Sequence, residues 1–174
     1  SISVAIYLTH IGMSVPARSM KTILYDRLIT SITVNENIFK GYSYFFSEVR
    51  RVKQVAEALS QKEKIFVLFD ELFKGTNVSD AYSTSKLIIS GLVQWKQSLF
   101  ILSSHLFELE KELKKYPEIS YYYFESEIQN GKPVFSYQLK QGISSACLGL
   151  VIIEQEKIME LLNLNKTYDK NRFT

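Results

Sequence analysis

A run of five apolar residues, Ile65 to Phe69, constrains the fold of this chain more than any other feature. A run without a polar break is typical of a strand that is buried on both faces of a parallel sheet. Two carboxylates, Asp70 and Glu71, follow directly. Because ligands of open α/β sheets bind at the carboxyl ends of the strands, we expect both acids at a site. Adjacent strand residues point to opposite faces, so each acid is expected to do a separate job.

The acid pair by itself allows two interpretations. In nucleoside triphosphatases of the P-loop class, the first acid helps to hold Mg²⁺, which prefers oxygen ligands. The second acid can orient or deprotonate the attacking water. The alternative is that Asp70 and Glu71 merely begin a loop after a buried strand, which is the commoner case for an isolated pair. The rest of the chain has to decide between them.

The composition is that of ordinary globular material with room for one core. The 174 residues are 46% hydrophobic and 22% charged, which suits one domain, or one domain with a small appendage. A net charge of +3 is too small to indicate a dedicated nucleic-acid-binding surface. The single cysteine, Cys147, excludes an internal disulfide and fits a reducing compartment such as the cytoplasm.

Hydrophobic periodicity predicts further elements on both sides of the central run. Before it, we expect a helix over 1–11, a strand in the later part of 23–33, and a helix that Ser43 caps and that ends near Leu59. The first helix carries no signal-peptide pattern and reads as already under way, which suggests a piece of a longer protein. The apolar residues expected on one face of the helix after Ser43 are Phe46, Val49, Val52, Val55, Ala56 and Leu59.

After the acids, the pattern predicts a loop, a helix and a second buried strand. Ser79 or Asp80 is the expected N-cap of a helix over about 81–95, and the strand covers 98–103. The residues that this helix is expected to turn towards the sheet are Leu87, Ile88, Leu92 and Trp95. A short helix should follow His105, with Leu106, Leu109 and Leu113 on one face.

The last third of the chain has a different pattern. Segments 120–129 and 134–140 flank Asn130-Gly131, which is a strong hairpin signal, and a helix is expected over about 152–163. We expect Phe135, Tyr137 and Leu139 to alternate onto one face of the hairpin.

The order of several short motifs resembles the ATPase domain of the MutS family, DNA mismatch-repair sensors related to ABC-type ATPases. Residues 70–76 read Asp-Glu-Leu-Phe-Lys-Gly-Thr against the family's DEIGRGT, and residues 103–109 read Ser-Ser-His-Leu-Phe-Glu-Leu against ATHYFEL. Residues 11–17 match IGxxVPA, residues 26–30 resemble DRIFTR, and residues 41–48 align without gaps on the signature GRSTFMVEM. The resemblance covers residues from about 11 to about 162.

This resemblance implies a fold and a set of site residues. The fold is an α/β, P-loop NTPase-like (ABC-type) domain over residues 1–162, with a mostly parallel sheet flanked by helices, a β-hairpin and a C-terminal helix. A polar tail then occupies 163–174. Asp70 would hold Mg²⁺, Glu71 would be the general base for water, and His105 would sense the γ-phosphate of ATP. The resemblance assigns further nucleotide contacts to Ser43, Asn35, Asn37, Thr76, Asn77 and Asp80.

Three departures from the family's pattern bear on activity. No Gly-Lys-Ser or Gly-Lys-Thr occurs in the sequence, so the P-loop GxxxxGK[ST] is absent and the domain is expected to be truncated at its amino end. Without those backbone N–H groups and that lysine, this fragment alone should bind ATP poorly and hydrolyse none. Tyr42 and Tyr44 replace the signature's arginine and threonine, and Lys74 replaces an arginine.

Two functions remain open at this point. The first is a DNA-dependent ATPase domain of a MutS-like mismatch-repair protein, which couples ATP binding and hydrolysis to clamping on DNA. Its partners would be a second MutS-like subunit, which meets this domain as a dimer, and duplex DNA bound through the parent protein. The alternative is a non-catalytic, nucleotide-responsive dimerisation module of a diverged MutS-like protein acting in another DNA transaction. Tyr42 and Tyr44 favour the alternative, whereas Asp70, Glu71 and His105 together favour the ATPase.

Overall fold

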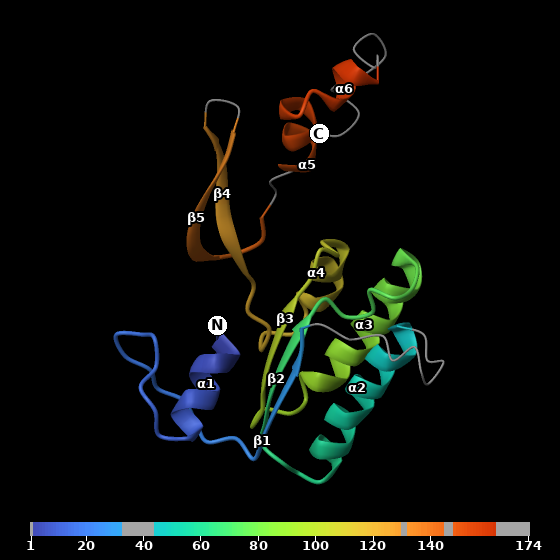
Figure 1. The fold of residues 1–174 in the computed structure, drawn as a ribbon. Helices are drawn as coiled ribbons and strands as arrows, with labels where there is room; N and C mark the ends of the chain where they lie inside the picture. The colour runs from blue at the N-terminus through green and yellow to red at the C-terminus, as the bar shows by residue number, and fades with distance from the viewer. Residues whose placement is uncertain (1, 33–43, 130–131, 145–147, 163–174) are drawn as a thin grey trace. The chain divides into compact units, whose positions relative to one another are not determined.

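The computed structural model describes residues 2–32, 44–129, 132–144 and 148–162. It divides into two compact units, residues 1–119 and 120–174, and each is considered by itself. The elements of the first unit are α1 (Ile2–His10), β1 (Arg27–Ser31), α2 (Tyr44–Ser60), β2 (Ile65–Asp70), α3 (Val78–Leu92), β3 (Leu99–Ser103) and α4 (Glu108–Leu113) (Figure 1).

A three-stranded parallel sheet in the order β1-β2-β3 forms the centre of the first unit. Val67 of β2 pairs with Ile29 on one side and with Phe100 on the other, so the apolar run has parallel neighbours on both sides. Ile65, Phe66 and Val67 are fully buried. The prediction of a central strand in a parallel sheet is therefore confirmed, as is the mixed α/β class.

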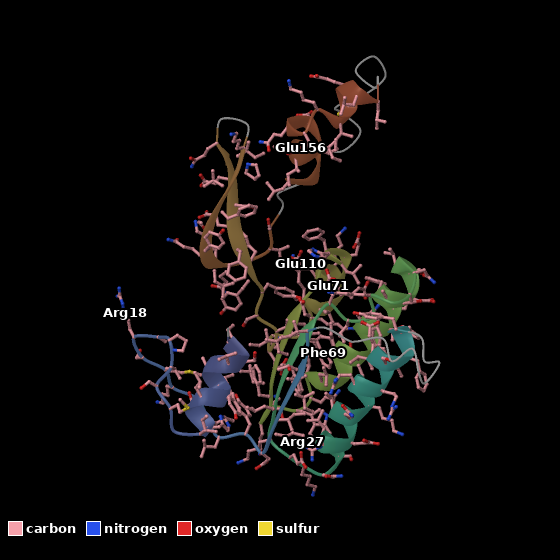
Figure 2. The ribbon with its side chains drawn as sticks, in the orientation of Figure 1. Arg18, Arg27, Phe69, Glu71, Glu110 and Glu156 are labelled. Carbon is pink, nitrogen blue, oxygen red and sulfur yellow. The ribbon has the colours of Figure 1, made fainter. Side chains whose placement is uncertain are left out.

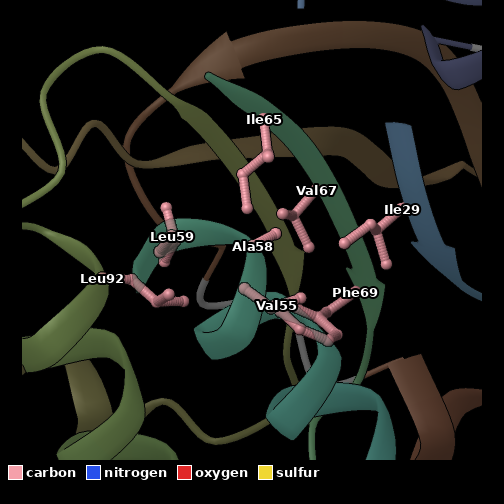
Figure 3. Packing of buried hydrophobic residues seen from close by; sticks show 8 residues of the cluster. All are labelled: Ile29, Val55, Ala58, Leu59, Ile65, Val67, Phe69 and Leu92. Atoms are coloured by element: carbon pink, nitrogen blue, oxygen red, sulfur yellow. The ribbon is translucent and has the colours of Figure 1, made fainter. Parts of the chain in front are cut away.

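The main core lies between β2 and α2. Ile65, Val67 and Phe69 alternate onto one face of the sheet, where they form a cluster with side chains of α2 and with Leu92 of α3 (Figure 3). On the other face, the ring of Phe66 lies 6.0 Å from the ring of Tyr25, which in turn stacks on His10 at the end of α1. Figure 1 shows α1 on the side of the sheet opposite to α2 and α3. Burial on both faces is why β2 carries no polar residue before Asp70.

The predicted face of α2 is right at Val52, Val55 and Leu59 and wrong at the other three positions. Val55 and Leu59 are buried, but Phe46 and Val49 are exposed, and Ala56 is exposed as well. The buried residue nearest the start of the helix is Glu48, at 5% exposure. The loop after β2 packs here, and Glu48 accepts hydrogen bonds from two of its backbone N–H groups, which need an acceptor when they are buried.

Helix α3 begins earlier than predicted, and its predicted face is right at two of four positions. Its N-cap is Asn77, whose side chain accepts a hydrogen bond from the backbone N–H of Asp80, so the expected caps Ser79 and Asp80 lie inside the first turn. Leu92 is buried and Ile88 packs on the core, whereas Leu87 and Trp95 are exposed. The earlier start follows from the Asn77 cap, which opens the helix at Val78.

The second unit contains β4 (Tyr122–Gln129), β5 (Lys132–Gln141), α5 (Leu148–Gln155) and α6 (Ile158–Leu161). The two strands pair antiparallel, which confirms the predicted hairpin, although residues 130–131 themselves lie outside the described part. A bulge opposite Phe124 and Ser126, with Tyr137 in a left-handed conformation, interrupts the expected alternation of Phe135, Tyr137 and Leu139.

The predicted helix over 152–163 is also different in detail. It is divided by Lys157, whose φ of 53° breaks the helical backbone between α5 and α6. Across the described parts of both units, no helix combines the length and the apolar character that crossing a membrane requires.

Candidate functional site at the carboxyl ends of the strands

The acids and the histidine meet at one end of the parallel sheet. Asp70 is the last residue of β2 and pairs in register with Ser103, the last residue of β3. His105 follows two residues later in the chain. Glu71 lies at the end of the sheet opposite Arg27, the first residue of β1 (Figure 2). Parallel pairing therefore brings together side chains that stand more than thirty positions apart in the sequence.

Asp70 is bound to β3 and remains open to solvent. The Ser103 hydroxyl donates a hydrogen bond of 2.6 Å to Asp70 Oδ1. The other oxygen, Oδ2, lies 3.9 Å from Lys74 Nζ, and the Asp70 side chain is 44% exposed. The hydrogen bond to one oxygen orients the carboxylate, and the side chain as a whole stays accessible to a ligand.

Glu71 holds the centre of the cluster. Its Oε1 lies 2.7 Å from His105 Nε2 and its Oε2 lies 2.8 Å from Lys74 Nζ, so each oxygen has a nitrogen partner. The Glu71 side chain is 24% exposed, whereas that of His105 is 88% exposed. Because the imidazole is otherwise largely surrounded by solvent, its bond to Glu71 is what fixes its position in this cluster.

The strand alternation from which separate jobs are expected for Asp70 and Glu71 does not extend to Glu71. Glu71 has a φ of 55°, which takes it out of the strand alternation, and Phe73 is also left-handed at 62°. The loop therefore turns back, and Lys74 reaches both carboxylates. The Lys74 pKa is raised above its usual value, first through the hydrogen bond to Glu71 and then through the charges of Glu71 and Asp70.

The polar residues after the loop form a separate local network at the start of α3. Asn77 Nδ2 donates to Asp80 Oδ2 at 2.8 Å, and the Thr76 hydroxyl donates to the same oxygen at 3.3 Å. The side chains of Thr76, Asn77 and Asp80 thus bond to one another and cap the start of α3. Ser43, Asn35 and Asn37 lie outside the described residues.

Comparison with known proteins identifies the family that carries this arrangement. The sequence model of MutS domain V matches residues 1–165. The chain belongs to the MutS domain V family. The DNA mismatch repair protein MSH3 of Candida glabrata is 29% identical over 86% of this chain and 15% of its own length. MutS of Ehrlichia ruminantium is 28% identical over 91% of this chain and 21% of its own length. MutS of Bacillus subtilis is 25% identical over 84% of this chain and 17% of its own length. The chain thus spans about a fifth or less of the length of these curated relatives.

Two residues of this candidate site were not singled out from the sequence. Ser103 ends β3 beside Asp70, a position that the strand register predicts once β2 and β3 are paired. Glu48 accepts hydrogen bonds from the backbone N–H groups of Lys74 and Gly75. A signal for Glu48 was present, since it stands four residues before Val52 and seven before Val55 and so shares their helical face.

Lys74 offers a first test of the charges at this site. We expect Lys74→Met to lower the free energy of unfolding by less than about 1 kcal/mol, because exposed ion pairs are weak and screened. The raised pKa means that the contribution is complete below pH 10.5 and is lost as the pH rises through the folded-state value. Chemical denaturation of both proteins at neutral pH and well above pH 10.5 measures this. A difference that persisted unchanged at the higher pH would contradict the assignment.

Proposed function

We propose that this chain is the ATPase domain of a MutS-like DNA mismatch-repair protein, and that it couples ATP binding and hydrolysis to clamping on DNA. The observation that carries the proposal is the Asp70, Glu71 and His105 cluster at the carboxyl end of a parallel sheet. Glu71 Oε1 lies 2.7 Å from His105 Nε2 there. The fold implied is the P-loop NTPase-like, ABC-type arrangement, over residues 1–162 with a polar tail beyond.

The donor set at this edge suits a magnesium ion that arrives with a nucleotide. Among the described residues, no group of three or more His, Cys, Asp or Glu side chains could hold a metal ion by itself. Mg²⁺ is commonly held by one or two carboxylates together with phosphate oxygens and water. Asp70, oriented by Ser103 and 44% exposed, supplies one such carboxylate. When bound, Mg²⁺ would neutralise the charge that develops on the transferring phosphoryl group.

The chain's own residues divide the remaining work. Glu71 would orient an attacking water and accept its proton, and His105 would hold the Glu71 carboxylate and meet the terminal phosphate. Lys74 now neutralises Glu71 at 2.8 Å, so proton acceptance requires this contact to loosen. Thr76, Asn77 and Asp80, with Ser43, Asn35 and Asn37, are proposed as further nucleotide contacts.

The activity of the whole protein is part of the same proposal. The sequence contains no Gly-x-x-x-x-Gly-Lys-Ser/Thr cradle, so the 174 residues alone are expected to bind ATP weakly and to hydrolyse none. A second MutS-like subunit is the proposed partner of this domain, and duplex DNA is the proposed partner of the full protein. The names of the relatives support this direction, since all three are DNA mismatch repair proteins.

The deciding experiment is Mg-ATP turnover by the full protein that carries this sequence, with and without duplex DNA. We expect hydrolysis, and a rate that changes when DNA is added. A DNA duplex with one mismatch, compared with the matched duplex, separates mismatch repair from another DNA transaction. Turnover that ignores both duplexes would contradict the coupling to DNA.

The second candidate, a nucleotide-responsive dimerisation module without turnover, is favoured by one specific observation. The proposed base, Glu71, has both carboxylate oxygens engaged, one by His105 and one by Lys74. A lysine that stays on Glu71 would prevent proton acceptance. Tight ATP binding by the full protein, with subunit association but no hydrolysis, is the result that would establish this candidate instead.

A further inference from the structure

A buried carboxylate on α2 holds the loop that carries the proposed catalytic glutamate. Glu48 is 5% exposed, and its two oxygens accept hydrogen bonds from consecutive backbone N–H groups. Oε1 accepts from Lys74 at 3.0 Å and Oε2 accepts from Gly75 at 3.1 Å. A carboxylate in the interior is costly unless it is hydrogen-bonded, so its place here calls for a specific purpose.

The loop held by Glu48 has a conformation that it would not adopt by itself. Glu71 and Phe73 have φ of 55° and 62°, a left-handed region that is unfavourable for residues other than glycine. Such residues persist only where the surroundings determine them. The loop's own sequence therefore does not explain the position of the Glu71 carboxylate.

Besides the hydrogen bonds to Glu48, three contacts impose this conformation, two with Phe45 of α2 and one with β3. The ring of Phe73 is 1% exposed and lies 5.7 Å from the ring of Phe45 on α2. The third contact comes from β3, because the Glu71 backbone N–H donates to the Ser103 carbonyl oxygen at 3.2 Å. Gly75 lies so close to Phe45 that an added Cβ would stand 2.6 Å from the Phe45 backbone nitrogen. The first turns of α2 and the loop thus form one packed assembly.

We propose that Glu48 is a positioning residue for Glu71, acting through the backbone of Lys74 and Gly75. Because Glu48 holds the backbone N–H groups of Lys74 and Gly75, it fixes the place from which the Lys74 side chain contacts the Glu71 carboxylate. A displacement of α2 along its axis would pull on these two hydrogen bonds and so move the Glu71 carboxylate relative to His105. The catalytic part of this inference rests on the proposed function, whereas the mechanical part does not.

Hydrogen exchange in the unaltered full protein tests the mechanical part. The Lys74 and Gly75 amides lie in a loop, so without the Glu48 carboxylate they would exchange like an unstructured peptide. We expect both amides to be protected. Rapid exchange at both positions would overturn the proposal without the need for any variant.

Glu48→Gln tests the proposal further, with Glu57→Gln as the matched control. Glu57 is an exposed glutamate on the same helix, paired with Lys53, so the chemical change is identical. In Glu48→Gln one of the two N–H groups faces an amide donor instead of an acceptor. We expect faster exchange at Lys74 and Gly75, and kcat lower by about 10- to 100-fold with an unchanged KM, since small misplacements of catalytic groups have effects of this order. Glu57→Gln should match the unaltered protein in both measurements.

The outcomes separate this inference from the proposed function. If Glu71→Gln abolishes turnover while folded Glu48→Gln retains full kcat, Glu48 is a folding residue only and the inference is overturned. If Glu71→Gln leaves turnover unchanged, the assignment of Glu71 as the base is wrong. Hydrogen exchange alone then tests whether Glu48 holds the loop. Faster exchange in Glu48→Gln than in Glu57→Gln then supports the holding of the loop, and equal exchange overturns it.

Discussion

Glu71→Gln should lower ATP turnover of the full protein by about 10²- to 10⁴-fold while ATP binding is retained. This is the usual range for removal of a general acid–base group. The amide keeps the shape of the side chain and can still contact His105, but it cannot accept a proton from water. Steady-state hydrolysis gives the rate, and titration with a fluorescent ATP analogue gives the affinity.

The matched control for this variant is Glu112→Gln. Glu112 is an exposed glutamate of α4. It pairs with Lys86, which is not part of the acid cluster. Turnover and ATP affinity are both expected to stay at the unaltered values. Equal turnover by Glu71→Gln and Glu112→Gln would show that Glu71 is not the base and would leave the dimerisation module as the better account.

Gly75→Ala is the substitution expected to disturb the first unit most for its size. The added Cβ would lie 2.6 Å from the Phe45 backbone nitrogen and 3.0 Å from Phe45 Cα, and backbone atoms cannot turn aside as a side chain can. The loop and the start of α2 must therefore separate. We expect a loss of about 1–3 kcal/mol in the free energy of unfolding, as overpacking of well-packed sites typically costs. The Lys74 and Gly75 hydrogen bonds to Glu48 should weaken with it.

Gly91→Ala is the control for that prediction. Gly91 lies in α3, and an added Cβ there would meet no atom within 4 Å. Alanine is the better helix former, so a gain of up to about 1 kcal/mol is expected. Hydrogen exchange of the β2 core amides, such as that of Phe66, reports the stability of the unit in both variants. Equal stability of the two variants would mean that the contact between Gly75 and α2 is not a tight one.

Prediction from the sequence succeeded for elements whose signal is a local, repeated pattern of apolar residues or a short turn motif. The unbroken apolar run of β2, the similar run of β3 and the hairpin around residues 130–131 were each recognised from composition and period, and the structure confirms them. The position of Asp70 at a strand end followed directly, because a run of apolar residues has to stop where the strand leaves the core. The family was recognisable for the same reason, since its motifs occupy those strand ends.

Prediction failed where a residue's partner stands far away in the chain. Glu48 was passed over because charged residues on a helix usually face water, and only the packed loop reveals two N–H groups that need an acceptor. Asn77 differs, because its partner Asp80 is only three residues away; its capping role was missed because the helix starts three residues before the expected position. Apolar periodicity places Glu48 on the buried face of α2, but it does not reveal the loop N–H groups that Glu48 binds.

By itself, then, the sequence determined the strands and the mixed α/β class, because these depend on hydrophobic period, and it predicted the acids and the histidine from short motifs. Only the tertiary structure decided that Glu71 turns left-handed out of β2, that Lys74 meets both acids, and that His105 binds Glu71. Those facts depend on parallel pairing of β2 with β3 and on the docking of α2 against a strained loop. The free energy that stabilises such a loop comes from contacts between segments, and no local pattern in the chain encodes it.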